Sequence, residues 1–114
     1  MTIPATTILV TRNGMGQSDP ALQTKLIQTY FRLLDESDTL PGVIAFYTEG
    51  VFLVCEDSPV LDSLASLEAK GVRLVICNTC LNFFNLVDKV VVGIPGSMTD
   101  IIEAQFRAEK VIAI

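Results

Sequence analysis

Histidine and tryptophan are both absent from the 114 residues of this chain. Without histidine, neither a Cys–His nucleophile pair nor a Ser–His–Asp triad can form. A zinc site would have to draw on thiolates and carboxylates alone, because the only cysteines are Cys55, Cys77 and Cys80. We therefore expect no metal and no cofactor. The thiols themselves are the groups left to carry chemistry.

Basic residues are few, since 8 Lys and Arg stand against 13 Asp and Glu, for a formal net charge of −5. A surface that binds phosphates is usually basic, so this balance argues against direct nucleic-acid binding. The sequence has no run of about 18 apolar residues that could cross a membrane. The first residues, Met1–Pro4, lack the charged and apolar segments of a signal peptide. We expect a cytoplasmic protein whose odd number of thiols forms no disulfide framework.

Apolar residues are abundant and make up 50% of the chain. A chain of this length suits one compact domain, residues 1–114, with a core that needs neither a disulfide nor a metal. The apolar fraction lies at the high end of the globular range. Either a sheet is buried on both faces or some apolar surface is kept for a partner, so we expect a homo-oligomer.

Short apolar runs rich in β-branched residues predict buried strands. They are Thr6–Val10, Val43–Tyr47, Val72–Ile76, Lys89–Val92 and Lys110–Ile114. Helical segments are expected between them, so the alternation predicts an α/β fold. We expect three layers, α/β/α, around a five-stranded, mainly parallel sheet.

Residues that cap helices mark the expected helix starts. These starts are Asp19-Pro20, Ser58-Pro59, and Ser97 with Asp100 three residues later. A short helix is also expected at Val51–Cys55, and a tight loop at Gly93–Gly96.

The loops that follow parallel strands meet at one edge of a sheet, where ligands usually bind. The loops expected there are Thr11–Gln17, Thr48–Cys55, Cys77–Cys80 and Gly93–Ser97.

Cys77 ends the third predicted strand, and Asn78, Thr79 and Cys80 follow it at the start of a segment that can be helical. A thiol at such a junction meets the unpaired N–H groups of the first helical turn and the positive end of the helix dipole. Both favour the thiolate, which is the reactive species. We predict that Cys77 is a nucleophile and that Cys80 resolves a persulfide or closes a disulfide with it. The alternative is a pair of small buried residues, since free cysteine packs as a small hydrophobe.

Other residues at the same edge are weaker candidates. Arg12 is the cation of the first loop and could stabilise a thiolate or an anionic sulfur species, although a solvated arginine is commoner. Asn78 and Thr79 could donate hydrogen bonds to the same sulfur. Gly14-Met15-Gly16 is not a dinucleotide fingerprint, because Asp19 stands where the third glycine is required.

Cys55 is flanked by Glu56 and Asp57. Two nearby carboxylates raise the pKa of a thiol and suppress its thiolate. We expect a packed thiol at this position, with a secondary sulfur site as the alternative.

Several stretches of the chain are similar to one known family. They are Phe46–Val51, Cys55–Leu61, Gly71–Leu81 with its Cys-Asn-Thr-Cys-Leu ending, and Ala108–Ile112. The sequence resembles the DsrE/DsrF-like family, which includes the sulfur-relay subunit TusD. The most similar pattern is that of the C-terminal domain of YedF-type, selenium-associated, sulfurtransferase-like proteins.

The resemblance implies a small DsrE-like α/β domain that assembles as a trimer or hexamer. In the sulfur-relay members, the cysteine that closes the third strand accepts a persulfide, and that position is Cys77 here. Cys80 matches the second cysteine of the YedF-type pattern. Those proteins carry a preceding TusA-like domain that this sequence does not include. We therefore expect the sulfur donor or acceptor, a TusA-like or rhodanese-like protein, to be another polypeptide.

Our leading hypothesis is a sulfur-carrier or sulfurtransferase-like protein that holds a persulfide on Cys77 and passes sulfur, or selenium, to a partner thiol. One alternative is a non-catalytic oligomeric scaffold, which the apolar composition favours. Another is a redox protein with a reversible Cys77–Cys80 disulfide.

Overall fold

The computed structural model describes residues 2–114, with side chains from Thr6 onward. The chain alternates between strands and helices, as the sequence predicts. The elements are β1 (Thr2–Val10), α1 (Pro20–Glu36), β2 (Leu40–Phe46), the 3-10 helix η1 (Thr48–Val54), α2 (Leu61–Ala69), β3 (Arg73–Cys77), α3 (Asn78–Phe83), the 3-10 helix η2 (Val87–Lys89), β4 (Ile94–Gly96), α4 (Met98–Arg107) and β5 (Lys110–Ala113).

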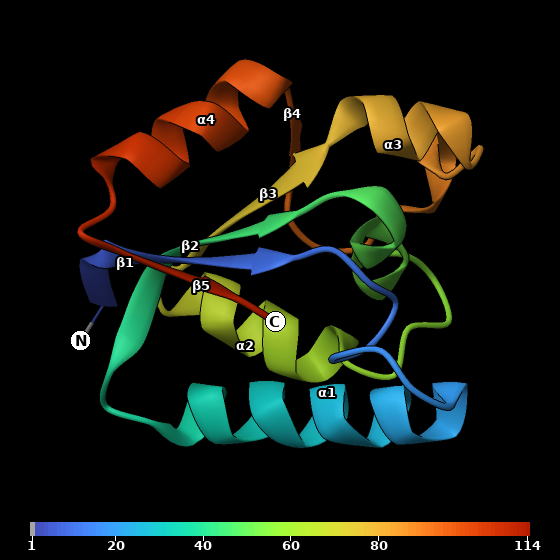
Figure 1. The fold of residues 1–114 in the computed structure, drawn as a ribbon, viewed down its shortest axis with the longest axis horizontal. Helices are drawn as coiled ribbons and strands as arrows, with labels where there is room; N and C mark the ends of the chain where they lie inside the picture. Colours follow the sequence, from blue (N-terminus) through green and yellow to red (C-terminus); the bar gives the residue numbers. More distant parts are fainter. Residues whose placement is uncertain (1) are drawn as a thin grey trace.

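The strands form one parallel sheet in the order β4-β3-β2-β1-β5. Helices α1 and α2 cover one face, and α4 crosses the other (Figure 1). A right-handed crossover explains this division. The chain steps one way across the sheet from β1 to β4 and then returns past β1 to β5, so the returning helix must lie on the opposite face. The predicted three-layer α/β fold is confirmed.

The period-2 alternation of the strands divides the core into two clusters. Ile8, Ile44 and Ile76 belong to the cluster under α1 and α2, whereas Leu9 and Ala45 belong to the cluster under α4. The sheet is therefore buried on both faces, which accounts for the nearly continuous apolar sequence of its central strands.

Two of the predicted helix starts are confirmed in detail. The Asp19 carboxylate accepts a hydrogen bond from the backbone N–H of Ala21 at 2.8 Å, and Pro20 is the first residue of α1. Ser97 and Asp100 form a reciprocal capping box at the start of α4. The third start is displaced, because α2 begins at Leu61 after Val60, which offers no capping side chain. The Ser58 hydroxyl instead accepts from the Val60 N–H in the preceding turn.

The predicted fourth strand is wrong. Lys89 lies in η2, and Val90 makes an isolated antiparallel bridge with Cys55. The N–H groups of Val91 and Val92 both donate to the carbonyl oxygen of Val54. The strand that joins the sheet is Ile94–Gly96, in the segment expected to be a loop. The apolar residues of 89–92 thus anchor the chain on η1, where their backbone groups are hydrogen-bonded.

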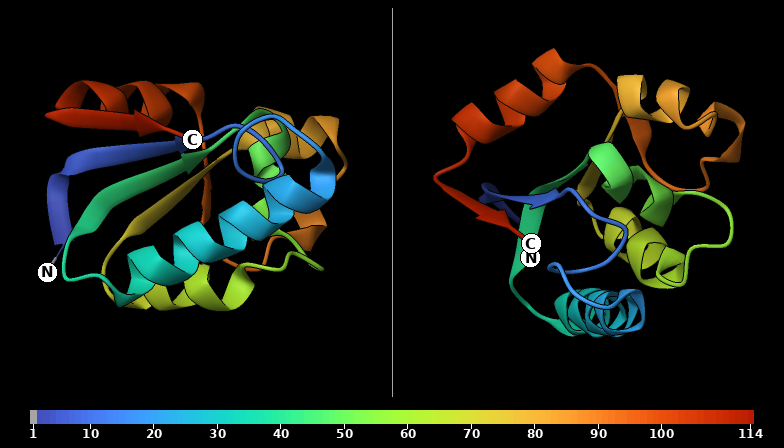
Figure 2. Two further views of the ribbon diagram at one scale, coloured as in Figure 1. Left: turned by 60° about the horizontal axis from the view of Figure 1, so that its bottom comes forward. Right: turned by 45° about the vertical axis from the view of Figure 1, so that its right-hand side comes forward.

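None of the helices within residues 2–114 has both the length and the hydropathy that crossing a membrane requires. The two further views in Figure 2 show α4 on the side of the sheet away from α1, with β5 at the edge of the sheet beside β1.

Candidate functional site at the end of strand β3

Cys77 is the last residue of β3, and α3 begins at the next residue, so the predicted strand-to-helix junction is present. The register pairs Cys77 with Gly96, the last residue of β4. Cys77 occupies the N-cap position of α3, but its side chain makes no capping hydrogen bond. The helix is also only 6 residues long, which limits its dipole.

The Cys77 side chain is buried, with 2% of its surface exposed. It packs in the cluster beneath α4, together with Val75 of the same strand and Ile101 and Ala104 of the helix. The alternation of β3 decides this orientation, since Ile76 points to the other core. The Cys77 thiol, which the sequence predicts at the open edge of the sheet, is therefore covered by α4.

Cys80 is half-buried and lies one turn further along α3, against both apolar clusters. Its sulfur accepts a hydrogen bond from the backbone N–H of Thr48 at 3.1 Å. Burial is the largest influence on the Cys80 thiol and raises its pKa, and the hydrogen-bonded Cys77 thiol adds to the rise. The Thr48 amide acts in the opposite direction, because it stabilises the thiolate. Cys80 is the member of the pair that solvent can reach.

Thr48 has a backbone φ of 48°, which is unusual for a β-branched residue. Its hydroxyl donates to the carbonyl oxygen of Thr11 at 2.5 Å, and thereby ties the end of β2 to the end of β1. Gly50 makes this approach possible, because a Cβ at that position would collide with the carbonyl oxygen of Val10. The ends of β1 and β2 are thus tied together at Thr48, whose amide contacts the Cys80 sulfur.

Sequence reasoning missed Thr48. The residue lies on a loop that was expected at this edge, but neither its type nor its spacing from Cys80 signals a contact across 32 positions.

Asn78 and Thr79 are exposed in the first turn of α3. The side-chain amide of Asn82 donates to the backbone carbonyl of Asn78 at 3.0 Å. Arg12 is exposed in the loop after β1 and lines a hollow that neither Cys77 nor Cys80 lines. The other residues of that hollow are Asn13, Gln17, Pro20, Gln23 and Glu49. The structure thus brings the two cysteines together but places Arg12 in a neighbouring hollow.

One of the four edge loops is not where it was expected. Gly93 precedes β4 and therefore lies at the opposite end of that strand from Ser97. Gly93 has a φ of 86°, and a Cβ there would lie 2.9 Å from Cδ1 of Ile76, so the chain turns tightly before entering the sheet.

Cys55 is buried, and its thiol donates to the carbonyl oxygen of Val51 at 3.2 Å. Burial raises the pKa of this thiol, and the nearby Glu56 carboxylate raises it further. The expected packed thiol is confirmed, although burial raises the pKa of Cys55 more than the nearby charge does. Within the described residues, no three His, Cys, Asp or Glu side chains gather in an arrangement that could hold a metal ion.

The architecture defines the class of protein: a small parallel α/β domain with a Cys-x-x-Cys pair where a strand meets a helix. The chain belongs to the DsrE/DsrF-like family, whose model matches residues 7–114. No curated protein matches it.

Solved structures share the fold at low sequence identity. The YchN protein of E. coli is 14% identical, with a TM-score of 0.67 over 96% of this chain and 97% of YchN. MTH1491 of Methanobacterium thermoautotrophicum is 17% identical, with a TM-score of 0.65 over 96% of this chain and 97% of its own. BT1422 of Bacteroides thetaiotaomicron is 13% identical, with a TM-score of 0.60 over 96% and 95%. The last two are described as proteins of unknown function.

Proposed function

We propose that this protein is a sulfur carrier that takes up a persulfide sulfur on its Cys77–Cys80 pair and passes it to the thiol of a partner protein. The observation that carries the proposal is the paired arrangement of the thiols. A half-exposed Cys80 contacts a buried Cys77, and the Thr48 amide donates to the outer sulfur. Membership of the DsrE/DsrF-like family supports the same function.

Sulfur enters at Cys80, because Cys77 is covered by α4. The Cys80 thiolate attacks the outer sulfur of a donor persulfide, and a new sulfur–sulfur bond forms as the donor's own bond breaks. The donor leaves as a thiolate, so the step needs no oxidant. The Thr48 N–H stabilises negative charge on Cys80 through a charge-assisted hydrogen bond.

Cys77 then takes over the sulfur. Its thiolate attacks the outer sulfur of the Cys80 persulfide, and the Cys80 thiolate leaves and takes up the proton that Cys77 lost. The sulfur then lies beneath α4, where water and competing thiols have little access. Return to Cys80 presents it to an acceptor, for which a TusA-like or rhodanese-like protein is the expected class. Asn78 and Thr79 are exposed beside the pair and available to that partner.

The test is mass spectrometry after incubation with a persulfide donor. We expect the wild type and Cys55→Ala to gain one sulfur atom. Cys80→Ala should load much more slowly, and Cys77→Ala should load but lose the sulfur rapidly to an added small thiol, which attacks the outer sulfur and releases the Cys80 thiolate. If the Cys77→Ala/Cys80→Ala double variant loads as well as the wild type, the proposal is wrong. Selenide-derived donors, tested in parallel, distinguish sulfur from selenium as the cargo.

The contact between the two thiols also favours a second function, reversible formation of a Cys77–Cys80 disulfide. The oxidant would be a disulfide such as oxidised glutathione, which is reduced to two thiols as the protein disulfide forms. Thiol trapping across a series of glutathione ratios tests this function. A disulfide that forms only under strongly oxidising ratios would favour the carrier.

A further inference from the structure

The hollow lined by Arg12 lies at the same edge of the sheet as the thiol pair. Its volume is about 360 Å³, which is the size of a site for a small molecule. Arg12 and Glu49 bring charges of opposite sign to its lining, and the other lining residues are uncharged. A ligand that carries both an anionic and a cationic group matches such a lining.

One hydrogen bond places both charged residues beside the thiols. It joins the hydroxyl of Thr48 to the carbonyl oxygen of Thr11, and Arg12 and Glu49 are the residues that follow these two in the chain. The Thr48 amide in turn donates to the Cys80 sulfur at 3.1 Å. Successive Cα atoms lie about 3.8 Å apart. A molecule held in the hollow is therefore about one residue's length from the amide that contacts Cys80.

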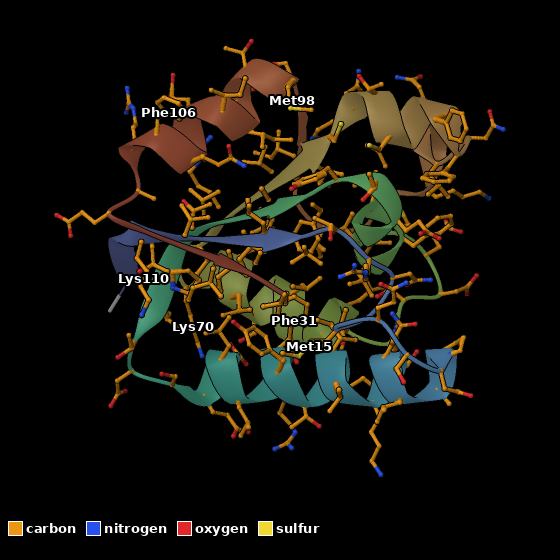
Figure 3. All side chains as sticks on the ribbon, in the orientation of Figure 1. Met15, Phe31, Lys70, Met98, Phe106 and Lys110 are labelled. Atoms are coloured by element: carbon orange, nitrogen blue, oxygen red, sulfur yellow. The ribbon has the colours of Figure 1, made fainter. Side chains whose placement is uncertain are left out.

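The loop that forms one wall of the hollow is fixed on α1. The side-chain amide of Gln23 donates to the carbonyl oxygen of Gly16 at 2.6 Å, and its backbone carbonyl accepts from the Met15 N–H at 3.1 Å. Met15 also packs against the core cluster that contains Phe31, and Figure 3 shows both residues between the sheet and α1. A wall fixed in this way reduces the entropy lost on binding.

The two charges of the hollow are available to a ligand. Among the side chains that the structure describes, neither Arg12 nor Glu49 forms an ion pair. The neighbouring Asp19 carboxylate is already engaged, because it accepts from the Ala21 N–H and caps α1. A guanidinium group offers a planar fork of donors that fits a carboxylate, and a glutamate accepts from an ammonium group. An α-amino acid carries both of these groups on one carbon atom.

We propose that the hollow binds the persulfide of a small amino-acid thiol, such as cysteine persulfide, as the sulfur donor. This inference rests on the proposed sulfur-carrier function and names the donor for it. Arg12 holds the carboxylate and Glu49 the ammonium group, so that the persulfide extends toward Cys80. The Cys80 thiolate bonds to the outer sulfur as the donor's sulfur–sulfur bond breaks, and the amino-acid thiolate leaves and takes a proton from water.

The rate of sulfur loading from four small persulfides tests the proposal. The persulfide of cysteine carries both charged groups, that of mercaptopropionate the carboxylate alone, that of cysteamine the amine alone, and that of mercaptoethanol neither. Arg12→Gln should slow loading from the two carboxylate donors about fivefold, the upper range for an exposed ion pair, and leave the other two unchanged. Glu49→Gln should slow loading from the two amine donors alone. Each variant is compared with the wild type on the same donor, which cancels differences in intrinsic reactivity.

Arg32→Gln and Glu36→Gln are the matched controls, because both residues are exposed on α1 and neither lines the hollow. They should load like the wild type from every donor. The proposal is overturned if Arg12→Gln and Glu49→Gln also load like the wild type throughout. Equal slowing on all four donors would overturn it too, because the charge would then act on the Cys80 thiolate. Loading from a protein persulfide but from no small donor would reject the small donor and keep the carrier.

Binding without sulfur transfer separates this site from the proposed function. S-methylcysteine has the same two charged groups but no sulfur to give away. In nitrogen–proton NMR spectra it should shift the side-chain amide signals of Gln17 and Gln23 in the wild type and not in Arg12→Gln. If the donors load but these signals do not move, the donor site is wrong and the carrier stands. If S-methylcysteine binds but no donor loads, the carrier function is wrong and the donor role falls with it.

Discussion

The backbone amide of Thr48 donates a hydrogen bond to the sulfur of Cys80 at 3.1 Å and joins the end of β2 to helix α3. The hydroxyl of the same residue donates to the carbonyl of Thr11, which fixes the direction of the amide. Cys77 lies within hydrogen-bonding contact of Cys80 and is buried from solvent. The reactivity of the pair therefore depends on how firmly Thr48 is held.

Replacing Thr48 by valine keeps the shape of the side chain but removes its hydroxyl. The Thr11 carbonyl then loses a donor, and we expect a loss of about 1–2 kcal/mol in the free energy of unfolding, measured in urea. The amide is no longer fixed, so the pKa of Cys80 should rise further. The pH profile of iodoacetamide alkylation at Cys80 measures that rise. Thr48→Ser keeps the hydroxyl and should behave as the wild type. If the alkylation profile of Thr48→Val also matches that of the wild type, the Thr48 amide has no electrostatic effect on Cys80.

Replacing Cys77 by alanine should lower the pKa of Cys80. The Cys77 thiol raises that pKa through its hydrogen bond and its charge, so its removal acts in the opposite direction. Alkylation of Cys80 at neutral pH should accelerate several-fold. Cys55→Ala is the control, because Cys55 contacts η1 rather than the pair. An unchanged Cys80 profile in Cys77→Ala would contradict the coupling.

The stability of the protein should fall as the pH rises above the ordinary thiol pKa of about 8.5. Burial raises the pKa of Cys55 and Cys80 in the folded state, so the unfolded chain releases these protons first. The stabilisation is complete below the unfolded-state pKa and is lost as the pH rises toward the folded-state values. Urea titrations at several alkaline pH values measure the slope. The slope should be shallower in Cys55→Ala and in Cys80→Ala than in the wild type, and a wild-type slope in both variants would place the cause elsewhere.

Replacing Ser97 by alanine should expose Cys77. The Ser97 hydroxyl accepts from the Asp100 N–H, and the Asp100 carboxylate accepts from the Ser97 N–H at 2.8 Å. Loss of this cap costs about 1 kcal/mol and frays the start of α4, the helix that covers Cys77. Alkylation of the Cys77 thiol should be several-fold faster in Ser97→Ala than in the wild type. In the control Thr99→Ala, which changes an exposed residue, Cys77 should be alkylated at the wild-type rate. Equal rates in both variants would mean that Cys77 is reached by another route.

Local chemistry in the sequence determined the alternation of elements, the caps at Asp19 and Ser97, and the position of Cys77 where a strand meets a helix. These features depend on neighbours within a few residues, so apolar periodicity and capping side chains are sufficient to predict them. The family was recognised from the same short stretches and is confirmed by the match over residues 7–114. The closer similarity to YedF-type proteins, the oligomeric state and the roles of Arg12, Asn78 and Thr79 remain predictions.

Only the tertiary structure decided which apolar segment enters the sheet and what surrounds the thiols. Residues 89–92 have the higher strand propensity, since Ile94–Gly96 contains a proline and a glycine, yet the pairing of Val90 with Cys55 directs residues 89–92 away from the sheet. The crossing of α4 buries Cys77, and a contact across 32 positions holds Cys80 against Thr48. Such contacts join segments far apart in the chain, and their geometry follows from the handedness of the crossovers and the packing of two cores rather than from any local pattern.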